Sequence, residues 1–146
     1  MQFKIKKFKD LSSQEIYDIL QLRSEVFVVE QNCVYQDIDG KDQKALHILG
    51  IKNKKIIAYT RIFKAGYYFK TASIGRVLVK ENQRKFNNGH KLMETSINTI
   101  KNFLNETKIT ISAQTYLKKF YESHNFQQVG EEYLEDGIPH IKMEIR

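Results

Sequence analysis

The chain has 146 residues, of which 41% are hydrophobic and 12% aromatic, so one domain with a substantial core is expected. It carries 24 Lys and Arg against 17 Asp and Glu, a net charge of +7 that favours an anionic partner. A single cysteine excludes an internal disulfide framework and a cysteine-rich zinc site. No run approaches the roughly 18 apolar residues of a membrane span, and the first residues lack the apolar segment of a signal peptide. We therefore expect a cytoplasmic protein without a membrane partner.

Hydrophobic periodicity predicts a mixed α/β domain with the element order β-α-β-β-β-α-β-α-β-β. Ser12 and Glu15 form the S-x-x-E pattern of a capping box, which indicates the start of the first helix. Segments 30–44 and 80–89 are polar and turn-rich, which is typical of loops. Strands are expected at 2–8, 45–51, 56–63, 73–79, 109–113, 128–134 and 140–146, and helices at 12–29, 89–104 and 117–124.

The charge is unevenly distributed along the chain. Residues 52–91 contain 11 of the 24 basic residues and one acid, Glu81. The acids gather instead in the segments 30–42 and 131–136. Such segregation favours an anionic ligand near the middle of the chain and a cationic one near the acidic loop 30–42. A nucleic-acid-binding module is the less favoured explanation, because 19 of the basic residues are Lys and base-edge readers rely on Arg.

The junction IGRVLVKENQRKFNNGHKLMETSI predicts a strand, a polar loop and a helix. A loop that ends at a helix N-terminus presents unpaired backbone N–H groups, and with the helix dipole these favour an anion such as a phosphate. Arg84, Lys85 and Lys91 would add positive charge there. The loop is neither a Walker A motif nor G-x-G-x-x-G.

The element order and this junction resemble the GNAT acetyltransferases, whose loop is written Q/R-x-x-G-x-G/A. Arg84 and Gly89 match that motif, and Asn87 replaces its middle glycine. Asn tolerates a left-handed backbone better than most residues, so the loop is expected to keep its shape. The resemblance is strongest to the ElaA-like family. The stretches that carry it are LQLRSEVFVVEQNCVYQDIDGKD, HILG, AYTRI, IGRVLV, FYESHNF and EDGIPHIKM.

The resemblance implies a single acetyltransferase domain over residues 1–146, with a mostly antiparallel central sheet and helices on both faces. It implies acetyl-coenzyme A as cosubstrate, an amine acceptor that is a small molecule or a peptide, and direct transfer in a ternary complex. No metal is implied, and a homodimer is compatible with the family. The residues expected at the coenzyme are Val77, Leu78, Val79, Arg84, Lys85, Asn87, Asn88, Gly89, His90, Lys91 and Gln114.

Tyr121 occupies the family position that protonates the departing thiolate. A phenol with a pKa of about 10 stays protonated at neutral pH and suits this role, although a core aromatic residue is the alternative. The candidate general bases are Glu30, His47 and His140, with structural histidines and an ion-paired glutamate as alternatives. Glu30, Asp37, Asp39 and Arg61 are the candidate acceptor-binding residues.

Cys33 is the single thiol, and we do not expect it to act as a nucleophile because direct transfer needs none. Two further functions remain open. One is a catalytically silent GNAT fold that only binds an acyl-coenzyme A, which the Asn87 substitution allows. The other is the nucleic-acid-binding module already described, although the chain carries no helix-turn-helix, zinc-finger or RNA-binding signature.

Overall fold

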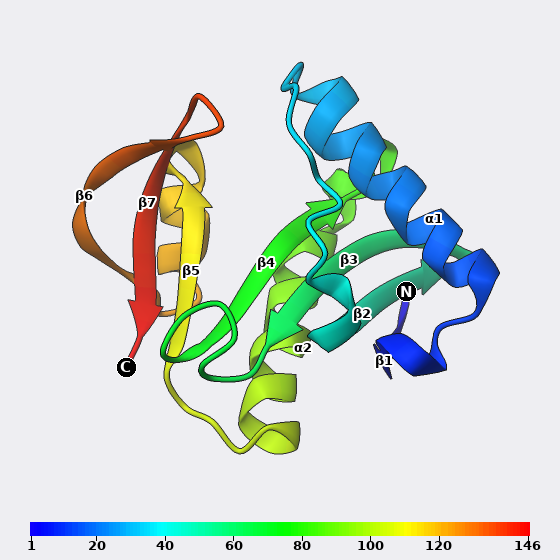
Figure 1. Cartoon of the computed structure of the whole chain (residues 1–146), viewed down its shortest axis with the longest axis horizontal. Helices are drawn as coiled ribbons and strands as arrows, with labels where there is room; N and C mark the ends of the chain where they lie inside the picture. The colour runs from blue at the N-terminus through cyan, green and yellow to red at the C-terminus, as the bar shows by residue number, and fades with distance from the viewer.

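The computed structural model describes all residues from 1 to 146 and contains one seven-stranded sheet with the order β1-β2-β3-β4-β5-β7-β6 (Figure 1). Every neighbouring pair is antiparallel except β4 and β5, which are parallel. The GNAT-like element order and the mixed, mostly antiparallel sheet are confirmed. The strands are β1 (Gln2–Lys7), β2 (Leu46–Lys52), β3 (Lys55–Phe63), β4 (Ala72–Val79), β5 (Ile109–Gln114), β6 (Gln127–Glu135) and β7 (Ile138–Ile145).

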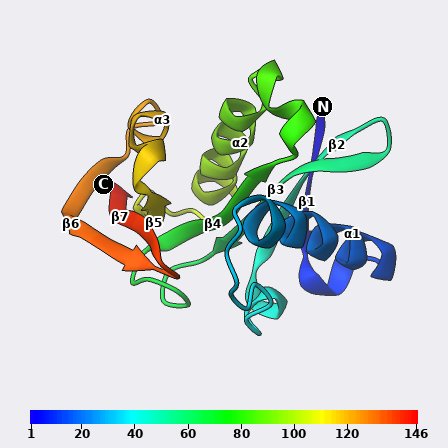
Figure 2. The ribbon, with the colours of Figure 1, turned by 90° about the horizontal axis from the view of Figure 1, so that it is seen from above.

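The helices cover both faces of the sheet: α1 lies on one side, and α2 and α3 lie on the other (Figure 2). Each face has its own apolar cluster, with the side chains of α1 in one and those of α2 in the other. No helix is long and apolar enough to cross a membrane. The helices are α1 (Ser13–Arg23), α2 (Asn88–Phe103) and α3 (Lys118–Glu122), and shorter helical turns are η1 (Phe8–Asp10), η2 (Ser24–Glu30), η3 (Asp42–Lys44), η4 (Glu81–Phe86) and η5 (Thr115–Leu117).

The capping box predicted at the start of α1 is present. Ser12 Oγ accepts from the amide of Glu15 at 3.1 Å, and the amide of Ser12 donates to Glu15 Oε1 at 2.9 Å. The predicted helix 12–29 does not stay α-helical, because its last two turns, Ser24–Glu30, widen into a π-helix. This widening ends the helix at the edge of the cavity described below, where π-turns are often found.

Two predicted loops are shorter than expected. The first is segment 80–89, most of which is taken up by the 3-10 helix η4. The hairpin between β6 and β7 turns over only two residues, Asp136 (φ 51°) and Gly137 (φ 77°), which suits a tight hairpin turn with left-handed residues. Glu135, Ile138 and Pro139 therefore belong to the strands and not to the turn.

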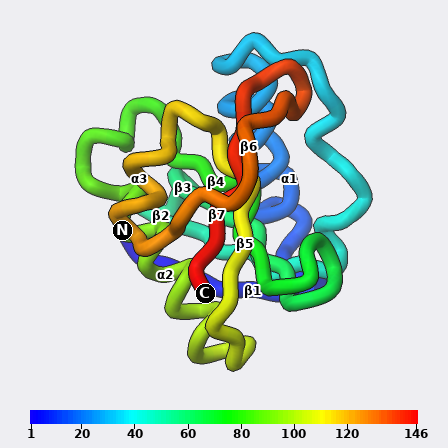
Figure 3. The backbone as a smooth tube through the Cα atoms, turned by 90° about the vertical axis from the view of Figure 1, so that its left-hand side faces the viewer, coloured from blue at the N-terminus to red at the C-terminus, as the bar shows by residue number.

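The parallel strands β4 and β5 separate soon after they meet. Ala72 pairs with Ile109 and Ser73 with Thr110, but no later residues of the two strands are paired. The strands β5, β7 and β6 continue as a separate antiparallel group (Figure 3). The tip of its β6–β7 hairpin meets the loop after η2, where Cys33 Sγ donates to the carbonyl of Asp136 at 3.5 Å. The sheet is thus split at its centre, and both halves contribute to what lies in the opening.

Candidate active site

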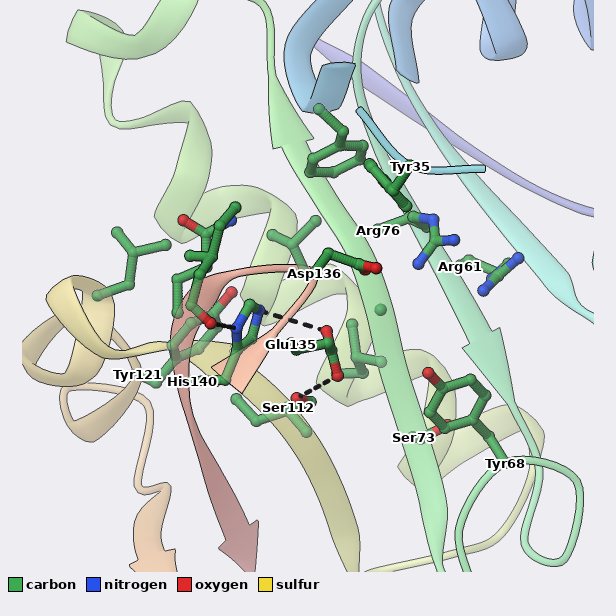
Figure 4. Close-up of a pocket in the computed structure, with 18 of the residues that line it drawn as sticks. Tyr35, Arg61, Tyr68, Ser73, Arg76, Ser112, Tyr121, Glu135, Asp136 and His140 are labelled. Atoms are coloured by element: carbon green, nitrogen blue, oxygen red, sulfur yellow. Dashed lines mark hydrogen bonds and ion pairs between the residues drawn. The ribbon is translucent and has the colours of Figure 1, made fainter. Parts of the chain in front are cut away.

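A cavity of about 130 Å³ occupies the opening between β4 and β5; we call it the central cavity (Figure 4). Its walls come from β3 and β4 on one side and from β5, α3 and the β6–β7 hairpin on the other, with η2 and the loop after it at one end. Apolar rings alternate with charged groups along these walls. The polar lining residues are Gln31, Tyr35, Arg61, Tyr68, Ser73, Arg76, Ser112, Gln114, Tyr121, Glu135, Asp136 and His140.

Strand β4 carries a bulge where it borders the central cavity. Tyr59 and Arg61 of β3 pair with Leu78 and Gly75, so Arg76 and Val77 have no partner on β3. Arg76 adopts a positive φ of 49°, a strained conformation for a non-glycine residue. Because β5 has already diverged, Arg76 and Val77 have no paired residue on either neighbouring strand, and a ligand could approach the backbone of β4 here.

The start of α2 has the backbone geometry expected for the predicted anion site. Asn87 has the left-handed conformation (φ 61°, ψ 19°) that was predicted to replace the family's glycine. Asn88, Gly89 and His90 form the first turn of α2, where the amides have no acceptor within the helix, and the amide of Lys91 bonds to the carbonyl of Asn87. Three successive N–H groups at a helix N-terminus can therefore hold a phosphate.

The side chains of several predicted coenzyme residues are buried, so only their backbone could contact a ligand. The Asn88 side chain is buried and donates to the carbonyl of Gln83 at 2.8 Å, which fixes the loop. Leu78 and Val79 are buried in the two apolar clusters. Val77 and Gln114 do line the central cavity, as the resemblance implied.

The structure corrects the assignment of Glu30 as a base or acceptor-binding residue. Its carboxylate pairs with Arg84, at 2.7 Å to Nη1 and 2.9 Å to Nη2, and it does not line the central cavity. Arg84 Nε also donates to the carbonyl of Val79 at 2.9 Å. The glutamate therefore holds the arginine of the loop in place beside the end of β4, and it raises the pKa of that arginine.

Tyr121 lies in the wall of the central cavity on α3. Its side chain is 5% exposed and packs edge-on against Phe120 and Phe126. Burial raises the pKa of its hydroxyl well above the ordinary value, so the proton is retained at neutral pH. The hydroxyl makes no hydrogen bond within the protein, which leaves it free to donate to a group in the cavity.

His140 and Glu135 form a proton-accepting pair in the same cavity. His140 Nδ1 donates to the carbonyl of Ile138 at 2.7 Å, because a carbonyl can only accept, so Nε2 is the nitrogen that takes up a proton. Nε2 lies 3.3 Å from Glu135 Oε2, and the other carboxylate oxygen accepts from Ser112 Oγ at 3.1 Å. The carboxylate is thus placed to stabilise the imidazolium (Figure 4).

The structure also corrects the assignment of His47 as a base. The side chain is 1% exposed and lies outside the central cavity. Its Nε2 donates to the carbonyl of Asp42 at 2.9 Å, and its Nδ1 accepts from the Tyr59 hydroxyl at 2.6 Å. Burial lowers the pKa of the ring, and neither nitrogen has a free lone pair for a substrate proton. His47 is a structural histidine.

The acidic loop does not offer free charge to an acceptor, contrary to expectation. Its aspartates are bound by buried arginines in a set we call the arginine–aspartate network. Burial favours the neutral acid at Asp39, but hydrogen bonds and the charge of Arg61 outweigh it and lower the pKa to about 2. The ion pairs join Arg23 to Asp37 and Asp42, Arg61 to Asp39 and Asp42, and Arg76 to Asp37 and Asp39, at distances of 2.7–3.5 Å.

This network reassigns three predicted acceptor-binding residues. Asp37 is 7% exposed and receives Arg23, Arg76 and the Tyr35 hydroxyl. Asp39 also accepts from the amide of Lys41, so the alternative of turn chemistry in this loop is confirmed. Arg61 lines the central cavity, but its two terminal nitrogens are taken by aspartates. The network shapes one wall of the cavity and adds little net charge to it.

Sequence reasoning missed Ser112, Arg76 and the role of Glu135. A signal for Glu135 existed, because Asp136-Gly137 is a typical two-residue hairpin turn. With that turn, Glu135 faces Ile138 and Tyr133 faces His140 across the hairpin, so Glu135 and His140 come close together. The bulge at Arg76 had no comparable signal, because bulges depend on the neighbouring strand.

Comparison with known proteins agrees with this architecture. Residues 7–146 match the family model described as an acetyltransferase (GNAT) domain. The chain is 46% identical to the protein ElaA of Escherichia coli over 136 residues, which cover 92% of this chain and 89% of ElaA.

Two crystal structures share the fold over their whole length. An acyl-CoA N-acyltransferase from Pseudomonas aeruginosa superposes with a TM-score of 0.93 at 36% identity, covering all of both chains. Escherichia coli ElaA superposes with a TM-score of 0.92 at 41% identity, covering 99% of both. On its sequence, its split sheet and these matches, the chain belongs to the GNAT acetyltransferase family and is similar to ElaA.

Proposed function

We propose that the protein is an N-acetyltransferase, formed by residues 1–146 as one domain, that transfers the acetyl group of acetyl-coenzyme A to an amine in the cytoplasm. The observation that carries the proposal is the central cavity itself. It brings a buried phenol that keeps its proton, Tyr121, into one space with a proton-accepting pair, His140 and Glu135. Acyl transfer to an amine needs both groups.

The binding groups fit coenzyme A. The amides of Asn88, Gly89 and His90 in the first turn of α2 suit its pyrophosphate, and Lys85 and Lys91 add positive charge at the same loop. The pantetheine arm can follow β4, where Arg76 and Val77 have no paired residue on either neighbouring strand. An N–H group of this bulge would polarise the thioester carbonyl, as an oxyanion hole does. Coenzyme A supplies the activated acyl group as its thioester.

The chemistry follows from the two walls of the cavity. An alkylammonium group with a pKa of about 10.4 must lose a proton before it can attack, and His140 Nε2 is placed to accept it. The neutral amine nitrogen then forms the new bond to the carbonyl carbon, the carbon–sulfur bond breaks with its electron pair left on the thiolate, and the second proton of the nitrogen passes to solvent. Tyr121 gives its proton to the departing thiolate, whose conjugate acid has a pKa near 8.5, and solvent restores the tyrosine. Cys33 takes no part, since no acyl-enzyme forms.

Turnover tests the proposal. Free thiol release is measured with acetyl-coenzyme A and a panel of amines that includes arylalkylamines, alkylamines, spermidine and a lysine peptide. Tyr121→Phe should lower kcat about 10²-fold, as expected for the loss of a general acid, and leave coenzyme affinity unchanged. An unaltered kcat for this variant would remove Tyr121 from the mechanism, and release with none of the amines would favour a silent acyl-coenzyme A-binding protein.

Coenzyme binding is tested separately by thermal shift. A Cβ at Gly89 would lie 3.5 Å from the Phe120 ring, an ordinary contact, so Gly89→Ala should keep the shift caused by acetyl-coenzyme A. Gly89→Phe places a large side chain over the first-turn amides and should abolish that shift. If both variants respond like the unmodified protein, the coenzyme does not bind at the start of α2.

A further inference from the structure

The charges in the central cavity do not cancel once the partners of each group are counted. Arg61 and Arg76 are paired with aspartates of the arginine–aspartate network, which contains three arginines and three aspartates. Glu135 and Asp136 also line the cavity, and neither forms an ion pair with a lysine or arginine. While His140, the partner of Glu135 at 3.3 Å, is neutral as a general base must be, the uncompensated charge is negative and lies at the β6–β7 hairpin, which favours a cationic ligand.

One wall of the cavity is aromatic. The ring of Tyr68 stacks on Phe63 with centroids 5.8 Å apart and planes 17° apart, and it meets Phe69 edge-on at 5.1 Å. Burial raises the pKa of the Tyr68 hydroxyl, and the charge of Glu135 raises it further, while Arg76 and Arg61 act in the opposite direction. Figure 4 shows Tyr68 and Glu135 as parts of one cavity. Lys41 Nζ lies 5.5 Å from the Tyr68 ring centroid and Lys142 Nζ lies 5.7 Å from the Phe69 centroid, so these rings already have cationic partners and offer a ligand a flat apolar surface.

We infer that the acceptor is a monocationic arylalkylamine, an aromatic ring joined by a short alkyl chain to a primary amine. Its ammonium group is held by Glu135 and Asp136, next to His140 Nε2, and its ring lies against Tyr68 and Phe69. This inference rests on the proposed function, because it names the substrate class of the same cavity. A carboxylate on the acceptor is disfavoured, because Glu135 and Asp136 repel it and the cavity arginines are already bound to aspartates.

The inference is tested with three amines, two of which differ from the first in a single feature. With acetyl-coenzyme A, 2-phenylethylamine carries both the ring and the cation, phenylalanine adds a carboxylate, and hexylamine lacks the ring. We expect kcat/KM for 2-phenylethylamine to exceed that of each of the others by about tenfold or more, the scale of one buried aromatic contact or one unfavourable charge in the cavity. Spermidine and a lysine peptide complete the series.

The outcomes separate the two proposals. Preferred turnover of hexylamine, phenylalanine, spermidine or the peptide overturns the arylalkylamine acceptor and leaves the N-acetyltransferase intact. Absence of turnover with every amine, despite a thermal shift with acetyl-coenzyme A, counts against the N-acetyltransferase itself.

Variants locate the effect in the cavity. Asp136→Asn keeps a residue that tolerates the positive φ of 51° at this turn, and it should raise KM for 2-phenylethylamine about tenfold while kcat changes little. Tyr68→Leu should raise KM for 2-phenylethylamine and not for hexylamine. Glu131→Gln removes an acid of the same hairpin, on β6 and outside the cavity, and is the matched control. Equal KM values for Asp136→Asn and the unmodified protein would overturn the placement of the ammonium group.

Discussion

Two acidic segments of this chain, 37–42 and 131–136, look alike in sequence but differ in what their charges do. In the first, each aspartate is bound by two buried or half-buried arginines, so the segment is an internal structural element. In the second, Glu135 and Asp136 have no basic partner from lysine or arginine and line the central cavity. The comparison teaches that the charge available to a ligand is what remains after internal pairing, which sequence composition does not reveal.

The difference arises from the side of the sheet to which each segment is attached. Segment 37–42 follows η2 and crosses β3 and β4, the strands that carry Arg61 and Arg76. Segment 131–136 ends at the tip of the β6–β7 hairpin, and no arginine of its own strands faces the cavity. The first segment is therefore expected to govern stability and the second to govern turnover.

The largest expected effect is a loss of stability when an aspartate of the first segment, Asp42, is replaced. Asp42 accepts from Arg23 at 2.7 Å and from Arg61 at 2.9 Å, and both arginines are at most 1% exposed. Asp42→Asn leaves two buried guanidinium groups with reduced compensation, so the free energy of unfolding should fall by about 3–5 kcal/mol. Urea denaturation measures this loss. Asp136→Asn is the matched change in the second segment and should stay within about 0.5 kcal/mol. Similar losses for the two variants would refute the distinction between the segments.

Much of the fold could be predicted from the sequence because its signals are local. The Ser12 capping box, the alternating strands and the periodic face of α2 each depend on neighbours within a few residues, and all were found where expected. The loop before α2 was also predicted, because the left-handed backbone of Asn87 is a property of that residue.

The site was predicted less completely, because its residues depend on contacts between distant segments. His47 and His140 looked equally suitable as bases, and only the Tyr59 hydroxyl and the carbonyl of Asp42 show that His47 has no free nitrogen. The aspartates likewise found partners 14 to 39 residues away. Pairing at such distances is set by the packing of the sheet and not by local pattern.

The second-largest expected effect distinguishes His140 from His47, one by its turnover and the other by its stability. His140→Gln removes the nitrogen that accepts the amine proton, so kcat should fall about 10²-fold with little change in stability. His47→Gln disturbs two buried hydrogen bonds and should lower the free energy of unfolding by about 1–3 kcal/mol, with turnover per folded molecule retained. Steady-state kinetics and denaturation are measured on both variants. A catalytic defect confined to His47→Gln would reverse the assignment.

A smaller effect concerns acid stability. The pKa of Asp39 is lowered to about 2 in the folded protein. At a pH between this value and the ordinary pKa, Asp39 is protonated in the unfolded chain but still charged in the folded protein. The stability that Asp39 contributes is therefore present at neutral pH and is lost as the pH falls from about 5 to about 2. Its half-exposed position limits the contribution to about 1 kcal/mol. Denaturation as a function of pH should show a shallower slope for Asp39→Asn, whereas Glu131→Gln should retain the full slope.

The smallest expected effect is on the ion pair that links the end of η2 to η4, the helical turn before α2. Glu30 and Arg84 pair at 2.7 Å, but their side chains are 31% and 42% exposed, so solvent screens the attraction. Glu30→Gln should change the free energy of unfolding by about 0.2–0.5 kcal/mol, and the change should shrink in high salt. Because Glu30 lies outside the central cavity, kcat should be unaffected. A loss of kcat as large as that of His140→Gln would restore Glu30 as the base. This variant therefore tests whether Glu30 is a structural or a catalytic acid.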